Sequence, residues 1–255
     1  MAPLPMRKLG QGFEVSCLGL GLMGMTAFYS TDPVPSSDCI ATIRRAIERG
    51  CTFFDTAELE LLDEGKIRHI GVSEVSAADL RKAAAIAPIS AYQLEWSLWS
   101  RDAEAEIIPL CRELGIGIVS YSPLGRGFLS GTIKSPADLS EDDFRRVGQP
   151  RFAEEAFKKN MEMVEKLRAV ATRKGCTPSQ LALAWVLAQG DDVVPIPGTR
   201  RTKYLEENLS AADIVLSADE LAELSQAFAP EAVSGQRYDQ ANMSATFHYG
   251  SDSKK

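Results

Sequence analysis

The sequence lacks several features that define particular classes of protein. Its five cysteines are odd in number and show no paired spacing of the kind that binds a metal, which indicates buried, reduced thiols in a reducing compartment. No stretch reaches the roughly 18 apolar residues that span a bilayer, and the opening residues MAPLPMRKLG contain no apolar core of a secretion signal. We therefore expect a cytoplasmic protein without a membrane partner.

An excess of positive charge is also missing. The 255 residues include 28 lysines and arginines against 35 aspartates and glutamates, a formal net charge of −7. This balance gives no electrostatic footprint for nucleic acid, so we expect a small-molecule partner. With 45% hydrophobic residues the chain can bury one large core or two smaller ones, and its oligomeric state stays open.

Short apolar runs alternate with amphipathic runs along most of the chain. We predict strands at Val15–Leu20, Cys51–Asp55, Ile67–Val72, Ala91–Glu95, Gly117–Ser120 and Val193–Pro197. Helix starts are marked by capping residues, as at Ser76, Thr177 and Ser217. The alternation predicts an α/β protein with a parallel sheet and crossover helices, either doubly wound or closed into a barrel.

Gly19, Gly21 and Gly24 have the G-x-G-x-x-G spacing of a dinucleotide-binding turn. That turn requires a helix to begin at the third glycine, because the free helix amides hold the diphosphate. Pro33 and Pro35 delay the next helix past residue 35, which disfavours a Rossmann dehydrogenase. The alternative is a first barrel strand whose glycines allow another part of the backbone to approach closely.

Polar side chains follow four of the apolar runs. They are Asp55, then Ser73 with Glu74, then Gln93 with Glu95, and then Tyr121 with Ser122. In a β/α barrel such residues gather at the carboxyl ends of the strands, where active sites form. Each could be only a structural group, but four polar strand ends in order favour a site.

Two later segments are suited to phosphate groups. SYSPLGRGFLSG, residues 120–131, combines three glycines with hydroxyls and Arg126, and such a loop can surround a diphosphate or form an ordinary turn. The helix start after the last strand carries Arg200, Arg201 and Lys203. These charges and the free helix amides favour a 2′-phosphate over a bare ribose, although a solvated basic helix start has the same composition.

A series of segments between about residue 7 and residue 228 matches one known family. They are KLGQGFEVSCLGLGLMGM, TFFDTAE, EGKIRHIGVSE, YQLEWSLWSRDAEAEIIPLCRELGIGIVSYSPLGRGFLSG, RFAEEAFKKN, GCTPSQLALAWVLAQGDDVVPIPGTRRTKYLEEN and LSADELAEL. They resemble the aldo-keto reductases, in particular the plant auxin-induced and perakine-reductase-like members. The resemblance implies one TIM-barrel-like (β/α) domain over residues 1–229, which binds NADPH and reduces aldehydes or ketones to alcohols by hydride transfer. The tail, residues 230–255, loses apolar periodicity and is expected at the surface or disordered.

By this resemblance Asp55 is one member of a catalytic tetrad of Asp, Tyr, Lys and His. The family tyrosine follows the aspartate closely, where this chain has Glu60 and Leu61, and the strands that carry the lysine and histidine are absent. The resemblance thus implies an internal deletion after Glu58, at 58–59, of two units of roughly 30 residues each, which leaves an incomplete fold of about six of eight βα units. His69 matches a family position that is not catalytic.

The resemblance also assigns residues to the cofactor, NADPH/NADP+. Ser73 and Gln93 would hold the carboxamide, and Tyr121 would pack on the nicotinamide ring. The other assigned residues are Ser122, Leu124, Gly125 and Arg126 at the diphosphate, Gly198, Thr199, Arg200 and Lys203 at the 2′-phosphate, and Glu207 and Asn208 at the adenine. Glu74 departs from the family, in which many members have asparagine.

Two functional hypotheses remain open. In the first, the chain is an NADPH-dependent aldo-keto reductase acting on a small carbonyl substrate, impaired because reduction needs a proton donor and the family Tyr, Lys and His are absent together. In the alternative, it is a catalytically inactive NADP-binding isoform, a gene-model fragment or an interaction protein.

Overall fold

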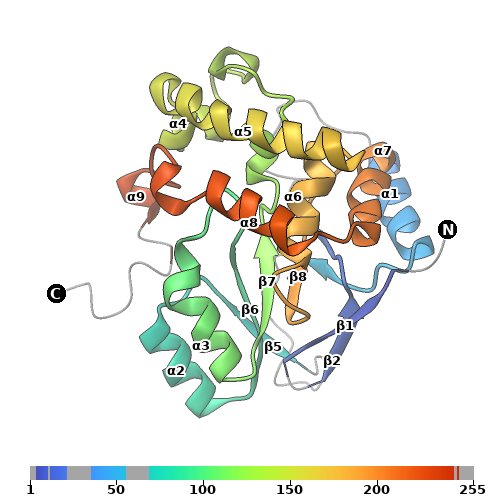
Figure 1. Ribbon diagram of the computed structural model, residues 1–255. Helices are drawn as coiled ribbons and strands as arrows, with labels where there is room; N and C mark the ends of the chain where they lie inside the picture. The colour runs from blue at the N-terminus through green and yellow to red at the C-terminus, as the bar shows by residue number, and fades with distance from the viewer. Residues whose placement is uncertain (1–3, 11, 22–35, 56–68, 244–245, 247–255) are drawn as a thin grey trace.

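The structure of the chain, a computed structural model, describes residues 4–10, 12–21, 36–55, 69–243 and 246 (Figure 1). Its strands are β1 (Met6–Leu9), β2 (Phe13–Ser16), β3 (Leu20–Gly21), β4 (Phe54–Asp55), β5 (Ile70–Ser73), β6 (Ile89–Glu95), β7 (Gly117–Tyr121) and β8 (Val193–Pro195). Its α-helices are α1 (Ser36–Glu48), α2 (Ala77–Ile86), α3 (Ile107–Glu113), α4 (Phe144–Val147), α5 (Glu154–Lys174), α6 (Pro178–Leu187), α7 (Thr202–Leu209), α8 (Ala218–Ala227) and α9 (Gln240–Met243).

Parallel pairing joins six of the described strands. β5, β6, β7 and β8 form one sheet in that order, and β3 pairs with β4 in a second. The Gly19 amide donates to the Pro195 carbonyl at 3.0 Å, which places β3 beside β8. Among the described residues the spatial order is therefore β4, β3, β8, β7, β6, β5. This is an incomplete TIM-barrel-like fold whose two end strands are β4 and β5.

The first predicted strand, Val15–Leu20, is wrong in extent. Its beginning belongs to β2, which pairs antiparallel with β1, and its end belongs to β3. The chain bends between them because the Ser16 hydroxyl donates to the Leu18 carbonyl at 2.7 Å, while the Cys17 amide donates to Pro5. One apolar run therefore forms two strands. The other predicted strands match β4 to β8 with ends shifted by a few residues, and residues 67–68 lie outside the described part.

The β1–β2 hairpin closes the amino end of the barrel. Leu9 and Val15 are buried against the interior side chains of β7 and β8. A Cβ on Gly117, at the start of β7, would lie only 2.7 Å from the Cβ of Leu9, so the hairpin's approach requires glycine there. Arg7 donates to three backbone carbonyls between α6 and β8 at 2.6, 2.7 and 2.9 Å. The hairpin is thereby fixed to the strand that precedes the expected phosphate site.

Gly21 in β3 and Gly19 just before it behave as the barrel-strand alternative predicts. A Cβ on Gly21 would lie 2.9 Å from the Ile196 carbonyl oxygen, and one on Gly19 would lie 2.7 Å from the ring of Phe53. Neither position can carry a side chain without moving a neighbouring strand. Gly24 lies outside the described residues, and α1 begins at Ser36.

The helices begin where the capping signals predict. Thr177 accepts from the Gln180 amide at 3.2 Å, and the Gln180 side chain accepts from the Thr177 amide at 2.8 Å. Ser217 and Glu220 form the same capping box at the start of α8. The helices lie outside the strands, with α3 against β7 and α1 against α7 (Figure 1). This arrangement leaves the carboxyl ends of the strands to the loops.

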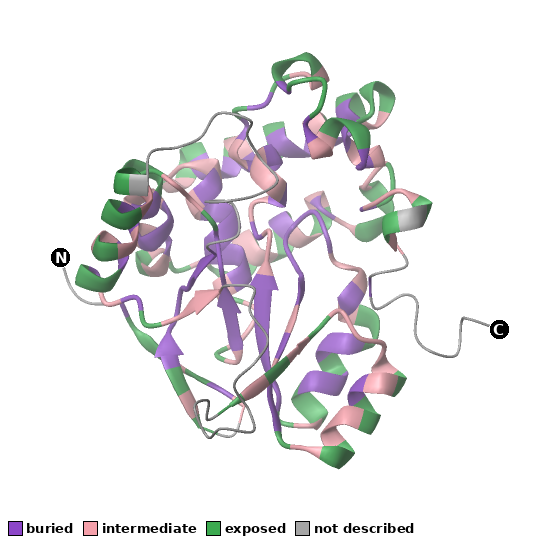
Figure 2. Cartoon of the chain, turned by 180° about the vertical axis from the view of Figure 1, so that it is seen from behind, coloured by how far each residue is buried: buried purple, intermediate pink, exposed green. Residues whose placement is uncertain are grey.

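The main core is formed by the four-stranded sheet with α2, α3, α5, α6 and α8, and β6 and β7 are buried along most of their length (Figure 2). The tail was expected at the surface or disordered; residues 230–243 have a described, ordered path, and most of them lie at the surface, with Arg237 buried. Asn160, fully buried on α5, accepts from the Ser234 amide at 2.8 Å and donates to the Ser234 carbonyl at 2.9 Å. Arg237 is only 4% exposed. The tail therefore packs across the end of the sheet.

Candidate functional site

The expected nicotinamide residues lie side by side at the carboxyl end of the sheet. Ser73 on β5 is in register with Gln93 on β6, and Glu95 on β6 is in register with Tyr121 on β7. Ser73 is exposed, whereas Gln93 and Tyr121 are half-buried. Parallel pairing thus brings three predicted site residues together although they are far apart in the sequence.

Asp55, which was expected to be a tetrad residue, contacts Gln93. The Gln93 Nε2 atom donates to Asp55 Oδ1 at 2.5 Å, which links β4 to β6. Burial raises the pKa of Asp55 above its ordinary value, and the hydrogen bond from Gln93 only partly offsets this effect. The amide that was expected to hold a carboxamide is therefore engaged by the aspartate.

Glu74 follows β5 and collects donors from three directions. Its backbone adopts a left-handed conformation with φ of 51°, and its side chain is 9% exposed. The carboxylate accepts from the Tyr121 hydroxyl at 2.8 Å and from the Glu95 amide at 3.0 Å. Arg237 adds two further bonds at 2.8 and 3.1 Å. Burial, followed by the nearby Glu95 and Glu74 charges, raises the pKa of Tyr121.

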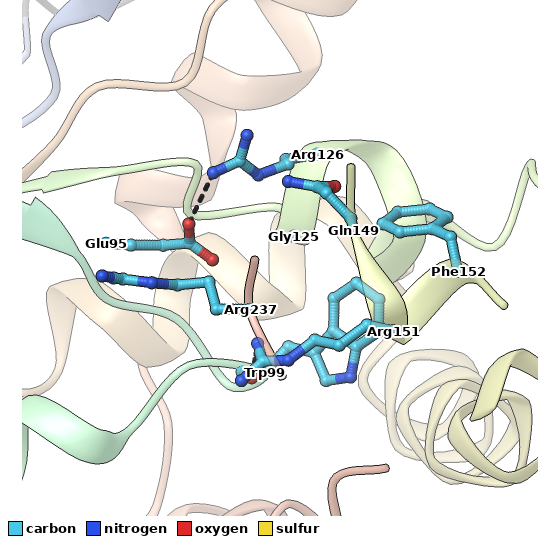
Figure 3. Close-up of a pocket in the computed structure, with 8 residues that line it drawn as sticks. All are labelled: Glu95, Trp99, Gly125, Arg126, Gln149, Arg151, Phe152 and Arg237. Carbon is cyan, nitrogen blue, oxygen red and sulfur yellow. Dashed lines mark hydrogen bonds and ion pairs between the residues drawn. The ribbon is translucent and has the colours of Figure 1, made fainter. Parts of the chain in front are cut away.

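A second buried ion pair, Arg126–Glu95, lies close to the Arg237–Glu74 pair. Arg126 Nη2 donates to Glu95 Oε2 at 2.7 Å (Figure 3). The Ser100 hydroxyl donates to the other Glu95 oxygen at 2.7 Å. Burial alone would raise the pKa of Glu95, but the charges of Arg126, Arg237 and Arg151 outweigh burial and lower it. Glu95 is therefore an ionised carboxylate with 3% exposure.

The 122–126 loop, which was expected to hold a diphosphate, contains three left-handed residues, and its arginine already has hydrogen-bond partners. Ser122, Gly125 and Arg126 have φ of 48°, 55° and 57°, and the Gly125 amide donates to the Ser122 carbonyl at 2.9 Å. Besides Glu95, Arg126 donates to the Tyr238 hydroxyl. With its amide oxygen turned toward the guanidinium, Gln149 accepts from Arg126 at 2.8 and 2.9 Å. Leu124 is half-buried against the core.

The expected 2′-phosphate residues lie after β8 and at the start of α7. Gly198, Arg201 and Lys203 are exposed, and Thr199 and Arg200 are half-buried. The Thr42 hydroxyl donates to the Arg200 carbonyl at 3.2 Å, which ties this segment to α1. The segment therefore presents cationic side chains to solvent from an anchored backbone.

The two expected adenine residues lie later in α7. Glu207 accepts from the Thr177 hydroxyl at 2.7 Å, so its carboxylate also serves the first turn of α6. Asn208 is 4% exposed and sits on the inner face of α7. Both lie beyond β8, apart from the Glu74 and Glu95 ion pairs.

Sequence reasoning missed four residues that complete the network at the mouth: Gln149, Arg151, Arg237 and Tyr238. With Glu95, Trp99 and Arg126, the first three line a small pocket (Figure 3). Their segments have no strand or helix period, so no pattern marks them as buried. Glu74 was the one signal in the sequence for a missed cation: if this strand-end carboxylate is buried, it requires a cationic partner.

Two further features concern the described residues as a whole. None of their helices combines the length and apolar character needed to cross a bilayer. They also contain no cluster of three or more histidine, cysteine, aspartate or glutamate side chains arranged to hold a metal ion.

Comparison with known proteins gives one family and two related folds. The sequence model of the Aldo/keto reductase family matches residues 60–229. The structure of a glycerol dehydrogenase from Gluconobacter oxydans has a TM-score of 0.75 at 18% identity, over 88% of this chain and 96% of that chain. A thermostable aldo-keto reductase in complex with the inhibitor epalrestat has a TM-score of 0.64 at 24% identity, over 88% of this chain and 100% of that chain. Both structures share the fold of this chain.

Proposed function

The chain belongs to the aldo/keto reductase family, and from this premise we propose that it binds NADPH at the carboxyl ends of β5 to β8 and has little activity as a carbonyl reductase. The observation that carries the proposal is a spatial one. Ser73, Gln93 and Tyr121 share one end of the sheet, and the exposed cations before and within α7 follow the next strand. A dinucleotide bound across β5 to β8 would meet both groups.

The chain's residues fit the phosphate-bearing end of NADPH. Arg200, Arg201 and Lys203 precede or begin a helix of eight residues, and Arg201 and Lys203 are exposed. Guanidinium and ammonium groups bind phosphate through charge-assisted hydrogen bonds, so a 2′-phosphate adds affinity that NADH cannot gain. Preference for NADPH over NADH is therefore expected.

The fit is poorer at the nicotinamide and diphosphate end. Gln93 donates to Asp55, and Arg126 is paired with Glu95. A carboxamide or a diphosphate would have to replace these contacts. Bound NADPH would supply a hydride, but the present arrangement of Gln93 and Arg126 gives no orientation for that transfer.

The proposed loss of catalysis depends on the proton donor. A general acid works best when its pKa lies near the working pH. Two phenols of the described residues lie at this mouth: the Tyr121 hydroxyl donates to Glu74, and the Tyr238 hydroxyl accepts from Arg126. Because burial and the neighbouring carboxylates raise the pKa of Tyr121, it is a poor acid at neutral pH. Asp55 can accept a proton but does not replace the family's tyrosine.

An internal deletion explains this loss in our proposal. The junction Glu58–Leu59 and the positions Glu60 and Leu61 lie outside the described residues. In the part of the chain that the structure describes, β4 and β5 are each hydrogen-bonded to one strand only. Two absent βα units between them would account both for these end strands and for the missing Tyr, Lys and His.

Titration calorimetry with NADPH and NADH tests the proposed cofactor. Arg200→Gln and Lys203→Gln should each weaken NADPH binding about tenfold or more, since each removes a charged hydrogen-bond donor, and should leave NADH nearly unchanged. Lys166→Gln is the matched control, because Lys166 is an exposed lysine on α5. Equal weakening of both nucleotides would remove the 2′-phosphate assignment.

A further inference from the structure

A segment near the C-terminal end crosses the mouth of the sheet. This strap, residues 233–239, lies between a 3₁₀ turn (Pro230–Ala232) and α9. Main-chain bonds hold it in place: Ser234 bonds to Asn160 through both its amide and its carbonyl, and the Asp239 amide donates to the Gly148 carbonyl at 3.2 Å. The strap therefore has a defined position over the ends of β5 to β7.

Two side chains of the strap point inward. Arg237 pairs with Glu74 at 2.8 and 3.1 Å, and its side chain is 3% exposed. The Tyr238 hydroxyl accepts from Arg126 Nη2, and the Arg126 guanidinium also lies over the Tyr238 ring at 4.8 Å. The strap thus contacts the one arginine of the 122–126 loop both through a hydrogen bond and through a ring face.

Arg126 cannot serve the strap and a diphosphate in the same way. Its Nη2 atom already donates to both Glu95 and Tyr238. Its Nη1 and Nε atoms donate to the Gln149 side-chain oxygen when that amide is turned toward them. A diphosphate needs guanidinium hydrogen atoms directed at its oxygens, and the fixed fork of arginine offers only five. Tyr238 is the most dispensable of these partners, because Glu95 is a buried charge that requires a cation.

We infer that the strap is an autoinhibitory contact in which Tyr238 competes with the diphosphate of NADPH for Arg126. This inference rests on the proposed function and adds its regulation. In the closed arrangement the adenosine end can bind at the start of α7, while the diphosphate end is excluded until the strap moves. The apparent affinity for the whole dinucleotide is then reduced by the small fraction of open chains. Anything that draws the strap away would raise that affinity.

If the strap instead helped to bind the cofactor, its variants would change NADPH affinity in the opposite direction. If Tyr238 and Arg237 helped to hold the diphosphate, removing either contact would weaken NADPH. Adenosine 2′,5′-bisphosphate separates the two ends of the site, because it carries the 2′-phosphate but has neither the diphosphate bridge nor the nicotinamide. Its affinity should not depend on the strap.

Calorimetry with Tyr238→Phe tests the inference. The variant keeps the ring over Arg126 but loses the hydroxyl, so NADPH should bind roughly tenfold more tightly while adenosine 2′,5′-bisphosphate is unchanged. Gln236→Ala, at an exposed neighbouring position of the strap, should change neither affinity. Unchanged or weaker NADPH binding, with the bisphosphate still bound, overturns the strap but leaves the proposed function standing. Failure of both ligands to bind overturns the proposed function and the strap with it.

Hydrogen exchange on the unmodified chain is a second, independent test of the inference and needs no variant. Saturating NADPH should speed exchange at the amides of residues 233–239, because the strap must leave Arg126, whereas adenosine 2′,5′-bisphosphate should not. Slower or unchanged exchange with NADPH bound would mean that the strap stays closed over the cofactor, which contradicts the inference.

Discussion

Nη2 of Arg237 lies 2.8 Å from Oε2 of Glu74, and the second nitrogen of the same guanidinium lies 3.1 Å from the other oxygen. The two residues are 163 positions apart, and their side chains are 3% and 9% exposed. A buried bidentate pair therefore joins the end of the first strand of the four-stranded sheet to the tail. Its two charges have lost most of their hydration, so each depends on the other.

The stability losses from removing the two partners of this pair should not be additive. Arg237→Met or Glu74→Gln alone is expected to lower the free energy of unfolding by about 3–5 kcal/mol, since the remaining charge stays buried without its partner. The double variant should lose clearly less than the sum of the two single losses. Urea unfolding of the four proteins measures this coupling.

Arg81 and Glu113 provide the matched control. They form the same bidentate geometry at 2.9 and 3.0 Å, but their side chains are 54% and 59% exposed. Water screens such a pair, so its variants should change unfolding little. If the Arg237–Glu74 losses were additive and as small as those of the exposed pair, the tail would not be anchored by this contact.

Glu95→Gln should destabilise the chain by about 3–5 kcal/mol at neutral pH, because Arg126 loses its buried counter-charge. The pKa of Glu95 in the folded chain lies below its ordinary 4.5, since neighbouring arginines outweigh burial. Its stabilisation is therefore fully present above pH 4.5 and is lost as the pH falls through the folded-state pKa. Urea unfolding of both proteins at falling pH should show the difference shrinking. If the difference in unfolding free energy between the two proteins stayed constant as the pH fell, ionisation of Glu95 would not contribute to the acid sensitivity of the fold.

Asp55→Asn should act in the opposite direction. Burial raises the pKa of Asp55 above 3.8, so the ionised carboxylate costs stability above the folded-state pKa, and this cost disappears as the pH falls toward 3.8. Asparagine keeps an oxygen for the Gln93 donor. The variant should melt at a higher temperature at neutral pH, and its advantage should shrink on acidification.

Asp138→Asn is the control for the predicted rise in melting temperature. Backbone amides of Lys134 and Ser135 lower the pKa of Asp138, so its replacement should not raise the melting temperature at neutral pH. Thermal unfolding monitored by circular dichroism decides both cases. A lower melting temperature for Asp55→Asn would show that the carboxylate stabilises the fold despite its burial.

The sequence best predicted those features that depend on residues close together in the chain, such as helix caps and buried strands. Ser217 with Glu220 caps a helix through residues three positions apart, and Thr177 was expected as a cap from its place before Pro178, so local spacing suffices. β6 and β7 lie in mostly apolar runs that end in polar residues, and most of their residues are buried. These signals also placed Gln93 and Tyr121 at strand ends. Their common location then follows from parallel pairing.

Long-range contacts could not be predicted in this way. Nothing in the local pattern around Arg237 indicates that it pairs with Glu74, because the tail has no apolar period. The β1–β2 hairpin was missed for a different reason: its strands are short and partly exposed, and the turn depends on Gly10 and Gly12 at φ of 51° and 110°. Those two glycines were a hairpin signal that the sequence did contain.

Carbonyl reduction should be nearly absent in this chain even where NADPH binds. General acid catalysis typically contributes about 10²–10⁴-fold, and misplacing a substrate loses more. Asp55 bonds to Gln93, and the Tyr121 hydroxyl is held by Glu74. Under the proposed function, Asp55 is therefore a carboxylate of the family site with no suitable acid beside it among the described residues.

NADPH oxidation with a panel of aromatic and aliphatic aldehydes measures this loss. The comparison is a chain in which the corresponding family segment has been inserted between Glu58 and Leu59. We expect the inserted chain to turn over at least 10²-fold faster, since it regains the tyrosine, its lysine and the histidine. Comparable rates would mean that another residue donates the proton. Tyr121→Phe then identifies it, because this variant would lose the rate only if the Tyr121 hydroxyl were the acid despite its bond to Glu74.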